Sequence, residues 1–324
     1  MKKCVFILPF FGKFNNYFNL FLKTCGMNRK FDWLIFTDDK SKYNYPSNVK
    51  VIYTTFQDLK EKIQEKLDIN ISLPKPYKLC DYRPAFGYIF SDYICEYEYW
   101  GHCDCDLIFG NLDAFLVPLL DEGYDKVFAA GHLTIYKNNV ENNMRFMKTY
   151  RGRVLYKKFL TVPRSCNFDE DWHLDNIHGI FLEAGTKVYC KSLAINPSNR
   201  HSLFVQREYD PVTRTYHDIK FGKAIYVWDK GNLYQILKGT FSEIVKKRNF
   251  LYMHFQEREM SMDPRVLDCD FFQIVPNKFI LLKKIPENNY EFARTLSAPI
   301  SAYLFAYRRI RKRIINKIKR VINK

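Results

Sequence analysis

Short apolar runs alternate with amphipathic segments in the N-terminal part of the sequence, and this pattern constrains the fold more than any other feature. Short strands are expected at 4–11, 32–36 and 49–53, and the continuous apolar run at 4–11 is typical of a strand buried on both faces. Apolar side chains recur at helical spacing at 15–23, after the first of these strands, and at 56–67, after the third. Strands that alternate with helices favour a parallel sheet with helices on its faces. We therefore expect an α/β fold with a doubly wound, mostly parallel sheet.

The alternation continues less regularly toward the C-terminus. Residues 78–93 are expected to form one helix, which tolerates Pro84 only near its first turn. A further helix is expected at 140–150. Short strands are expected at 187–193, 224–228, 232–237 and 250–255, and a short apolar run occurs at 279–282. We expect one domain over residues 1–290, followed by a tail at 291–324.

Composition and cysteine spacing exclude several classes of protein. Nine cysteines are scattered without a Cys-x-x-Cys pair, which is typical of reduced thiols and not of a disulfide framework. The cluster of His102, Cys103 and Cys105 has no second pair at matching spacing, so structural zinc is not expected. Neither GxSxG, a P-loop nor GxGxxG occurs, so serine hydrolase, kinase and dehydrogenase activities have no support.

The N-terminal apolar run resembles the start of a signal peptide, but it is short and lacks a small-residue cleavage site. No stretch of the sequence approaches the roughly 20 apolar residues that a transmembrane helix needs. We therefore expect a cytoplasmic protein that is soluble or peripheral to a membrane.

Two carboxylates one residue apart, Asp104 and Asp106, follow the aromatic run 97–102. If this run is a strand, both acids point the same way, while Cys103 and Cys105 point to the other face. Two acids on one face repel each other, so such a pair holds a divalent cation, shares a proton or lies in water. Ligands of open α/β sheets bind beyond the carboxyl ends of strands, where a divalent ion would bridge two phosphates.

Several blocks of sequence carry a resemblance to a known family. They are LPFFG at 8–12, YKLCDYRPAFG at 77–87, WGHCDCDLIFGN at 100–111, GHLTIYKN at 131–138 and LYMHFQ at 251–256. Together they resemble bacterial polysaccharide glycosyltransferases of the GT-A fold, a nucleotide-binding α/β fold marked by Asp-x-Asp. They are particularly similar to the transferases found among capsule and O-antigen assembly proteins. The resemblance covers roughly residues 4–260 and implies a GT-A-like, Rossmann-type sheet.

The resemblance implies a role for each matched position. Asp106 would be the main ligand of Mn²⁺ or Mg²⁺, Asp104 would contact the metal and the donor's ribose, and His254 would complete the metal site. The residues expected around the donor nucleotide are Pro9, Phe10, Phe11, Asp38, Lys78, Asp81 and Arg83. A helix start beside a diphosphate suits basic side chains and exposed N–H groups. A solvated lysine or a capping aspartate is the alternative for any single residue among them.

The candidates for a catalytic carboxylate are Glu170, Asp171 and Asp175, in a polar stretch that also contains His178. An inverting transferase needs a base to accept the proton of the acceptor hydroxyl. A retaining one needs a group that stabilises the oxocarbenium-like state on the leaving-group side. We expect at least one of the three acids to line the acceptor side, and surface positions are the alternative for each.

The tail concentrates the positive charge of the chain. The net charge is +16, and residues 308–324 contain nine basic residues and no acidic one. Apolar residues between 303 and 322 recur at helical spacing, opposite a basic face. A basic amphipathic helix of this kind lies in an anionic membrane interface. Nucleic acid and an acidic partner helix are the alternatives.

These observations predict a metal-dependent glycosyltransferase that moves a sugar from a nucleotide-sugar, with UDP-hexose as the first choice. The acceptor would be a lipid-linked glycan of bacterial surface polysaccharide biosynthesis, at the inner face of the cytoplasmic membrane. Two alternatives stay open: a nucleotidyltransferase acting on sugar phosphates, and a non-catalytic nucleic-acid-binding protein that uses the tail.

Overall fold

The computed structural model describes residues 2–198, 203–239, 246–256 and 258–296, together with positions 307, 310, 311, 314, 315 and 318. The chain is a mixed α/β protein that divides into two compact units. The first unit comprises Met1–Ser192 and Glu208–His217, and the second comprises Leu193–Arg207 and Asp218–Lys324. The expected boundary at 290 stays a prediction.

The first unit is built on a largely parallel sheet of seven strands among its described residues. In spatial order they are β3 (Val49–Tyr53), β2 (Phe31–Thr37), β1 (Lys2–Pro9), β4 (Tyr97–Cys103), β7 (Leu133–Lys137), β6 (Lys126–Val127) and β10 (Val188–Tyr189). The pairs β1–β2, β1–β4, β2–β3 and β6–β10 are parallel, whereas β7 runs antiparallel to β4 and β6. The expectation of a mostly parallel sheet is confirmed.

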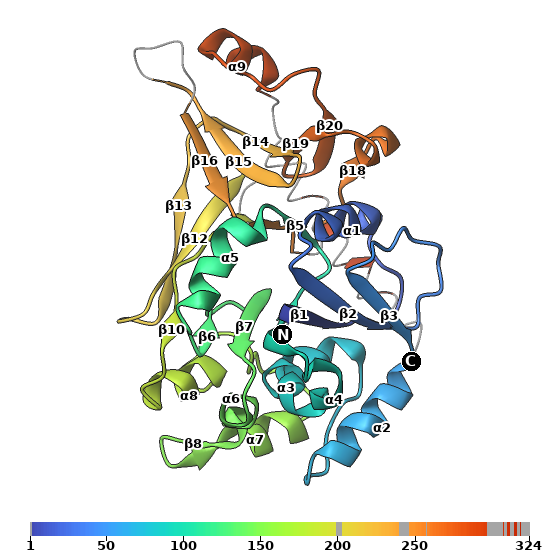
Figure 1. Ribbon diagram of the computed structural model, residues 1–324, viewed down its shortest axis with the longest axis vertical. Coiled ribbons are helices and arrows are strands. Elements are labelled where there is room, and N and C mark those ends of the chain that lie inside the picture. Colours follow the sequence, from blue (N-terminus) through green and yellow to red (C-terminus); the bar gives the residue numbers. More distant parts are fainter. Residues whose placement is uncertain are drawn as a thin grey trace. The chain divides into compact units, whose positions relative to one another are not determined.

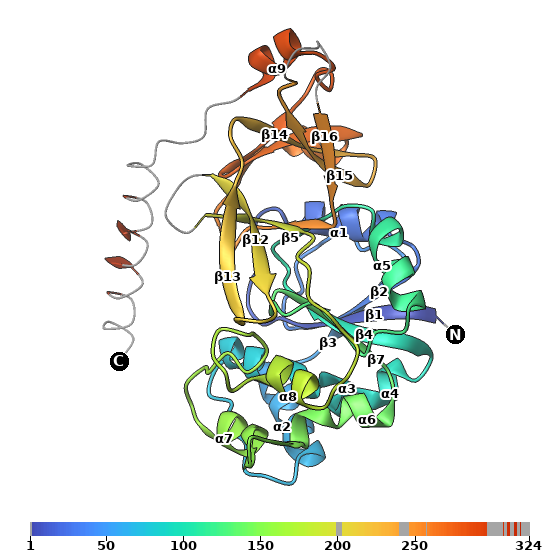
Figure 2. The ribbon, with the colours of Figure 1, turned by 90° about the vertical axis from the view of Figure 1, so that its left-hand side faces the viewer.

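Helices cover both faces of this sheet (Figure 2). On one face lie α1 (Phe18–Met27) and α5 (Leu112–Asp121). On the other lie α2 (Phe56–Lys66), the 3₁₀ helix η1 (Pro76–Ala85), α3 (Phe86–Ile89), α4 (Ser91–Ile94), α6 (Val140–Asn143), the 3₁₀ turn η2 (Arg145–Met147), α7 (Leu155–Thr161) and α8 (Ile177–Glu183). The pair β8 (Thr149–Tyr150) and β9 (Arg153–Val154) precedes α7, and the short strand β5 (Leu107–Phe109) precedes α5.

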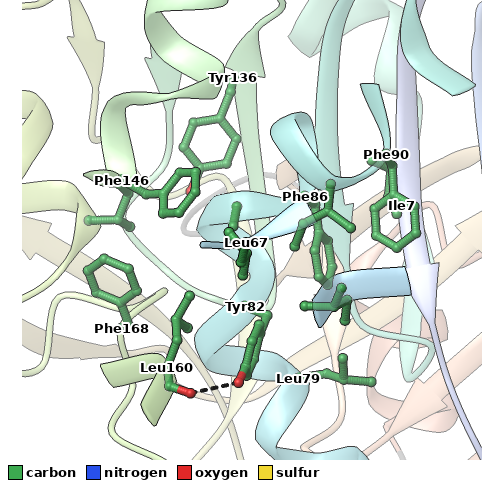
Figure 3. Packing of buried hydrophobic residues seen from close by; sticks show 14 of the residues in the cluster. Ile7, Leu67, Leu79, Tyr82, Phe86, Phe90, Tyr136, Phe146, Leu160 and Phe168 are labelled. Atoms are coloured by element: carbon green, nitrogen blue, oxygen red, sulfur yellow. Dashed lines mark hydrogen bonds between the residues drawn. The ribbon is translucent and has the colours of Figure 1, made fainter. Parts of the chain in front are cut away.

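The two helical layers explain why the strands are apolar without alternation. Val5 and Ile7 of β1 belong to a core cluster on the side of α2, η1 and α3. Phe6 points to the opposite face, where its ring lies 5.4 Å from Trp33 and 6.3 Å from Phe109. Figure 3 shows the first cluster, to which β1, η1, α3, α7 and β7 all contribute side chains. Burial on both faces therefore produces the continuous apolar runs.

The second unit is mainly antiparallel. Its six-stranded sheet, counted over the described residues, has the order β16 (Lys246–Phe250), β15 (Asn232–Leu237), β14 (Ala224–Asp229), β19 (Phe271–Val275), β20 (Lys278–Leu281) and β18 (Ser261–Met262). Phe292 of α9 (Asn289–Thr295) packs on this sheet (Figure 1). Two further elements of the unit, β11 (Ala194–Pro197) and β17 (Tyr252–His254), pair in parallel. The remaining 3₁₀ turn is η3 (Pro264–Leu267). The strands β12 (Phe204–Asp210) and β13 (Thr215–Lys220) contribute residues to both units.

Two predicted helices are wrong in form. Residues 78–93 form η1, α3 and α4 instead of one α-helix, because Pro84 has no N–H to continue an α-helical ladder and disfavours helical backbone at Arg83. The predicted helix at 140–150 is limited to the short α6 and η2, after which the chain enters β8.

Among the described residues, no helix is both long enough and apolar enough to cross a membrane. Most of the predicted basic helix at 303–324 lies outside the described residues. Its described apolar side chains are 39–62% exposed and belong to Tyr307, Ile310, Ile314, Ile315 and Ile318.

Candidate functional site

The carboxyl ends of three parallel strands bring the expected donor-binding residues to one edge of the sheet. β1, β2 and β4 end at Pro9, Thr37 and Cys103, so the segments that follow them leave from the same edge. The chain passes from β1 to β2 and β3 and then crosses back to β4 on the other side of β1. Such a switch point, here between β1 and β4, is where open α/β sheets bind ligands.

Asp104 and Asp106 lie in a bend between β4 and β5, beyond this switch point. Since β4 ends at Cys103, strand alternation does not set the directions of the two acids. The Asp104 N–H donates to the carbonyl of His132 at 3.0 Å, and Asn15 Nδ2 donates to the carbonyl of Cys105 at 3.3 Å. The bend is thus fixed from both sides, by the segment before β7 and by the loop after β1.

Arg83 connects this bend to the acidic stretch that follows α7. Its Nη1 donates to the carbonyl of Gly131 at 2.9 Å and to Asp169 Oδ2 at 2.8 Å, and its Nη2 donates to Asp104 Oδ1. Burial lowers the pKa of Arg83, but the two carboxylates outweigh this and raise it well above its usual value. A permanently charged guanidinium therefore lies at the switch point, held by two acids.

Asp169 was missed by the sequence prediction, which chose its neighbours. Its side chain is 2% exposed, and burial raises the pKa of Asp169 to about 8, against the opposing effect of Arg83. Gly131 lies close to the side chains of Asp169 and Glu170. A Cβ at this position would lie 2.7 Å from Asp169 Oδ2 and 2.3 Å from Glu170 Cγ. Only glycine fits this contact, so the segment before β7 is shaped around the two acids.

Lys78 and Asp81 form a buried ion pair at 2.6 Å, and neither side chain is exposed. The Lys78 ammonium also donates to the carbonyls of Phe159 at 2.7 Å and Arg164 at 2.6 Å. Asp81 accepts from the Cys166 N–H at 2.8 Å and the Phe168 N–H at 2.9 Å. The pair therefore fastens residues 159–168 to η1. Contact of Lys78 or Asp81 with a nucleotide stays a prediction.

Of the three predicted catalytic acids, Asp171 and Asp175 are held in ion pairs. Asp171 is buried and accepts two bonds from Arg214, at 2.5 and 2.9 Å, as well as bonds from Tyr209 and Asn176. Asp175 is bound by both terminal nitrogens of Arg153, at 2.6 and 2.8 Å. Both acids are thus held by arginines, and a catalytic role for either stays a prediction.

The third predicted acid, Glu170, is half-buried and accepts from the indole N–H of Trp172. The nearby His178 is buried, with Nδ1 3.3 Å from Lys126 Nζ. Burial and the adjacent cation hold the pKa of His178 well below its usual range, so the imidazole is neutral.

The residues after β1 and β2 support each other at the same edge. Phe10 stacks on Phe14 with ring centroids 4.4 Å apart, and Phe11 lies edge-on to Phe56 at 5.4 Å. The exposed Asp38 accepts from the Gly12 N–H at 2.8 Å. These contacts close the loop after β1 over the ends of the two strands.

His254 lies on β17 in the second unit, 7% exposed, with Nδ1 3.3 Å from Asn196 Oδ1. Asp104 and Asp106 belong to the first unit. Ligation of one metal ion by all three stays a prediction.

The chain belongs to a family of unknown function, DUF6625, which it matches over residues 6–283. The match includes the bend at 104–106, Arg83, Asp169 and His254. No curated protein matches the chain.

Proposed function

We propose that this member of the family is a metal-dependent glycosyltransferase, which moves a sugar from a nucleotide-sugar, with UDP-hexose as the first choice, to a glycan acceptor. The observation that carries the proposal is the position of Arg83 between Asp104 and Asp169, beyond the switch point of the sheet. A guanidinium beside paired acids suits a diphosphate, because the acids take a divalent ion and the guanidinium binds phosphate oxygens. The resemblance to GT-A transferases supports the same assignment.

The donor atoms of the predicted metal site fit Mn²⁺ or Mg²⁺. Asp104 and Asp106 offer carboxylate oxygens and His254 an imidazole nitrogen, a set that Mn²⁺ accepts readily, and Mg²⁺ favours the oxygens. Asp104 retains 26% side-chain exposure while Arg83 holds its Oδ1, so its direction is set and part of it remains reachable. The ion would neutralise the charge of the departing diphosphate.

In this proposal two acids of the same stretch, Asp169 and Glu170, act on the acceptor side. Asp169 is buried against Arg83, and burial raises the pKa of its carboxyl group, which favours a hydrogen-bonding role for this acid on the acceptor side. Glu170 is half-buried beside it and is the remaining candidate for a base that accepts the proton of the acceptor hydroxyl. Arg83 ties Asp169 to the bend at Asp104 and so fixes the spacing between the donor and acceptor sides.

The direct test measures release of nucleoside diphosphate from a panel of nucleotide-sugars by the full chain with Mn²⁺. Asp106→Asn keeps the shape of the side chain and removes its charge, and we expect turnover to fall by about 10²-fold or more. The matched control is Asp121→Asn, at a 60% exposed position, which should keep the activity of the wild type. Unchanged turnover of Asp106→Asn would refute the proposal, and pyrophosphate as product would identify a nucleotidyltransferase.

We propose that the acceptor is lipid-linked and that the tail holds the enzyme on an anionic membrane. The exposed apolar side chains among Tyr307, Ile310, Ile314, Ile315 and Ile318 fit the apolar face of an interfacial helix. A chain ending at residue 302 should lose binding to phosphatidylglycerol vesicles in flotation and keep turnover of soluble nucleotide-sugar. Retained flotation, or loss of RNA binding without loss of flotation, would contradict this role.

A further inference from the structure

A cavity of about 350 Å³ lies in the first unit. Its lining comes from one stretch of chain between Lys158 and Asp175. The volume falls at the lower end of the range that small-molecule sites occupy, roughly 300–1,000 Å³. The stretch includes Phe159 and Val162, which give the cavity an apolar part.

The charge of this lining is positive. Lys158 and Arg164 are exposed, and within the described part of the chain no carboxylate forms an ion pair with either. The acid of the lining is Asp175, which Arg153 already binds through two hydrogen bonds. Two cations therefore face the cavity, and its single acid is neutralised by an arginine.

The wall of the cavity is held in place by buried polar contacts. Lys78 donates to the carbonyls of Phe159 and Arg164, and Asp81 accepts from the Cys166 N–H. Tyr82 donates to the carbonyl of Leu160 at 2.8 Å, the bond drawn in Figure 3. A wall fastened at these points is formed before a ligand arrives, which reduces the entropy lost on binding.

We propose that this cavity binds a phosphate monoester or diphosphate through Lys158 and Arg164. An arginine binds two phosphate oxygens at once and a lysine adds a point charge, and together they match a dianion. The cavity also has room for an organic group against Phe159 and Val162. Asp175, one of the three predicted catalytic acids, is among the lining residues. This site stands whether or not the chain transfers a sugar.

The first test titrates inorganic pyrophosphate into the full chain by calorimetry, in EDTA so that the acids at 104 and 106 hold no metal. The double variant Lys158→Ala/Arg164→Ala should bind pyrophosphate about tenfold more weakly or worse, because it loses both charge-assisted contacts. A tenfold loss corresponds to about 1.4 kcal/mol of binding free energy. The control Lys157→Ala/Lys148→Ala removes the same charge from exposed positions outside the cavity and should bind like the wild type. Equal binding by the two double variants, or no binding by the wild type, would overturn the proposal.

A second experiment tests whether the bound phosphate belongs to a lipid headgroup or to a water-soluble compound. Flotation with phosphatidylcholine vesicles containing phosphatidic acid compares the two double variants, which share the same tail and net charge. Weaker flotation of Lys158→Ala/Arg164→Ala assigns a phosphorylated lipid headgroup. Equal flotation, together with the loss of pyrophosphate binding, assigns a water-soluble phosphate compound. Thermal unfolding of each variant without ligand checks that the wall is intact.

Discussion

Replacing Lys78 with methionine tests whether this lysine fastens residues 159–168 or serves a ligand. Lys78 and Asp81 are both fully buried, and the ammonium donates to Asp81 and to two carbonyls. Lys78→Met keeps most of the side-chain volume but leaves the Asp81 carboxylate buried without its cation. Breaking a buried ion pair by removing one partner costs about 3–5 kcal/mol. That is a large share of the roughly 5–15 kcal/mol that stabilises a folded domain.

Two measurements follow this loss. Urea unfolding should show a free energy of unfolding lower by about 3–5 kcal/mol. Trypsin should cleave after Arg164 faster than in the wild type, because the Arg164 carbonyl loses its bond to Lys78 and the segment opens more often. The matched control is Lys75→Met, which removes the same charge at an exposed position of the same segment and should change stability by less than about 0.5 kcal/mol.

If Lys78→Met and Lys75→Met unfold at the same urea concentration and are cleaved at the same rate, Lys78 does not fasten residues 159–168. Unchanged stability together with lost binding of nucleotide-sugars would assign Lys78 to the ligand instead.

Three further predictions follow from the contacts of the acidic stretch. The pKa of Asp169 is higher in the folded than in the unfolded protein, so the free energy of unfolding falls as the pH rises toward about 8. This decrease is at most about 1.4 kcal/mol per pH unit. Asp169→Asn should remove it, as measured by urea unfolding between about pH 5 and 9. Curves that stay parallel to the wild type would contradict it. Arg214→Ala breaks the buried ion pair with Asp171 and should lower the free energy of unfolding by about 3–5 kcal/mol. Arg153→Ala breaks the pair with Asp175, in which the arginine is half exposed, and should lower it by about 0–1 kcal/mol. Equal losses would show that burial does not set the contribution of these ion pairs to stability. Gly131→Ala forces a Cβ against two acids and should lower the free energy of unfolding by about 1–3 kcal/mol. Gly222→Ala is its control, because a Cβ at Gly222 meets nothing within 4 Å.

The parallel part of the fold was predictable from local patterns. β1 and β2 are largely apolar without alternation because helices cover both faces, and α2 carries its apolar side chains at helical spacing. The hairpin of β12 and β13 was not predicted, since its residues are mostly polar and its tip belongs to the first unit through Arg214. Such a contact joins residues 43 positions apart, and no local pattern records it.

The candidate site was predictable only in part. The spacing of Asp104 and Asp106, and their place after a buried strand, identified the acid pair. The stretch Asp169-Glu170-Asp171 gave no means of ranking three adjacent acids. The three acids differ in burial and in their partners, which only the fold shows. Asp171 is held by Arg214, Glu170 is half-buried, and Asp169 is buried against Arg83.

By itself the sequence determined the alternation of strands and helices from β1 to α2, the spacing of the acid pair and the position of the basic tail, because these depend on periodicity and on residue type. The tertiary structure decided which charges are buried and with whom. The sequence predicted that Lys78 contacts a nucleotide, and that stays a prediction; the fold shows that its ammonium donates to Asp81 and to two carbonyls. Asp104 and Arg83 are 21 positions apart in sequence and meet only because β4 returns beside β1. The pKa and the partner of a charged group depend on contacts between residues that are distant in sequence, and no local sequence pattern indicates those contacts.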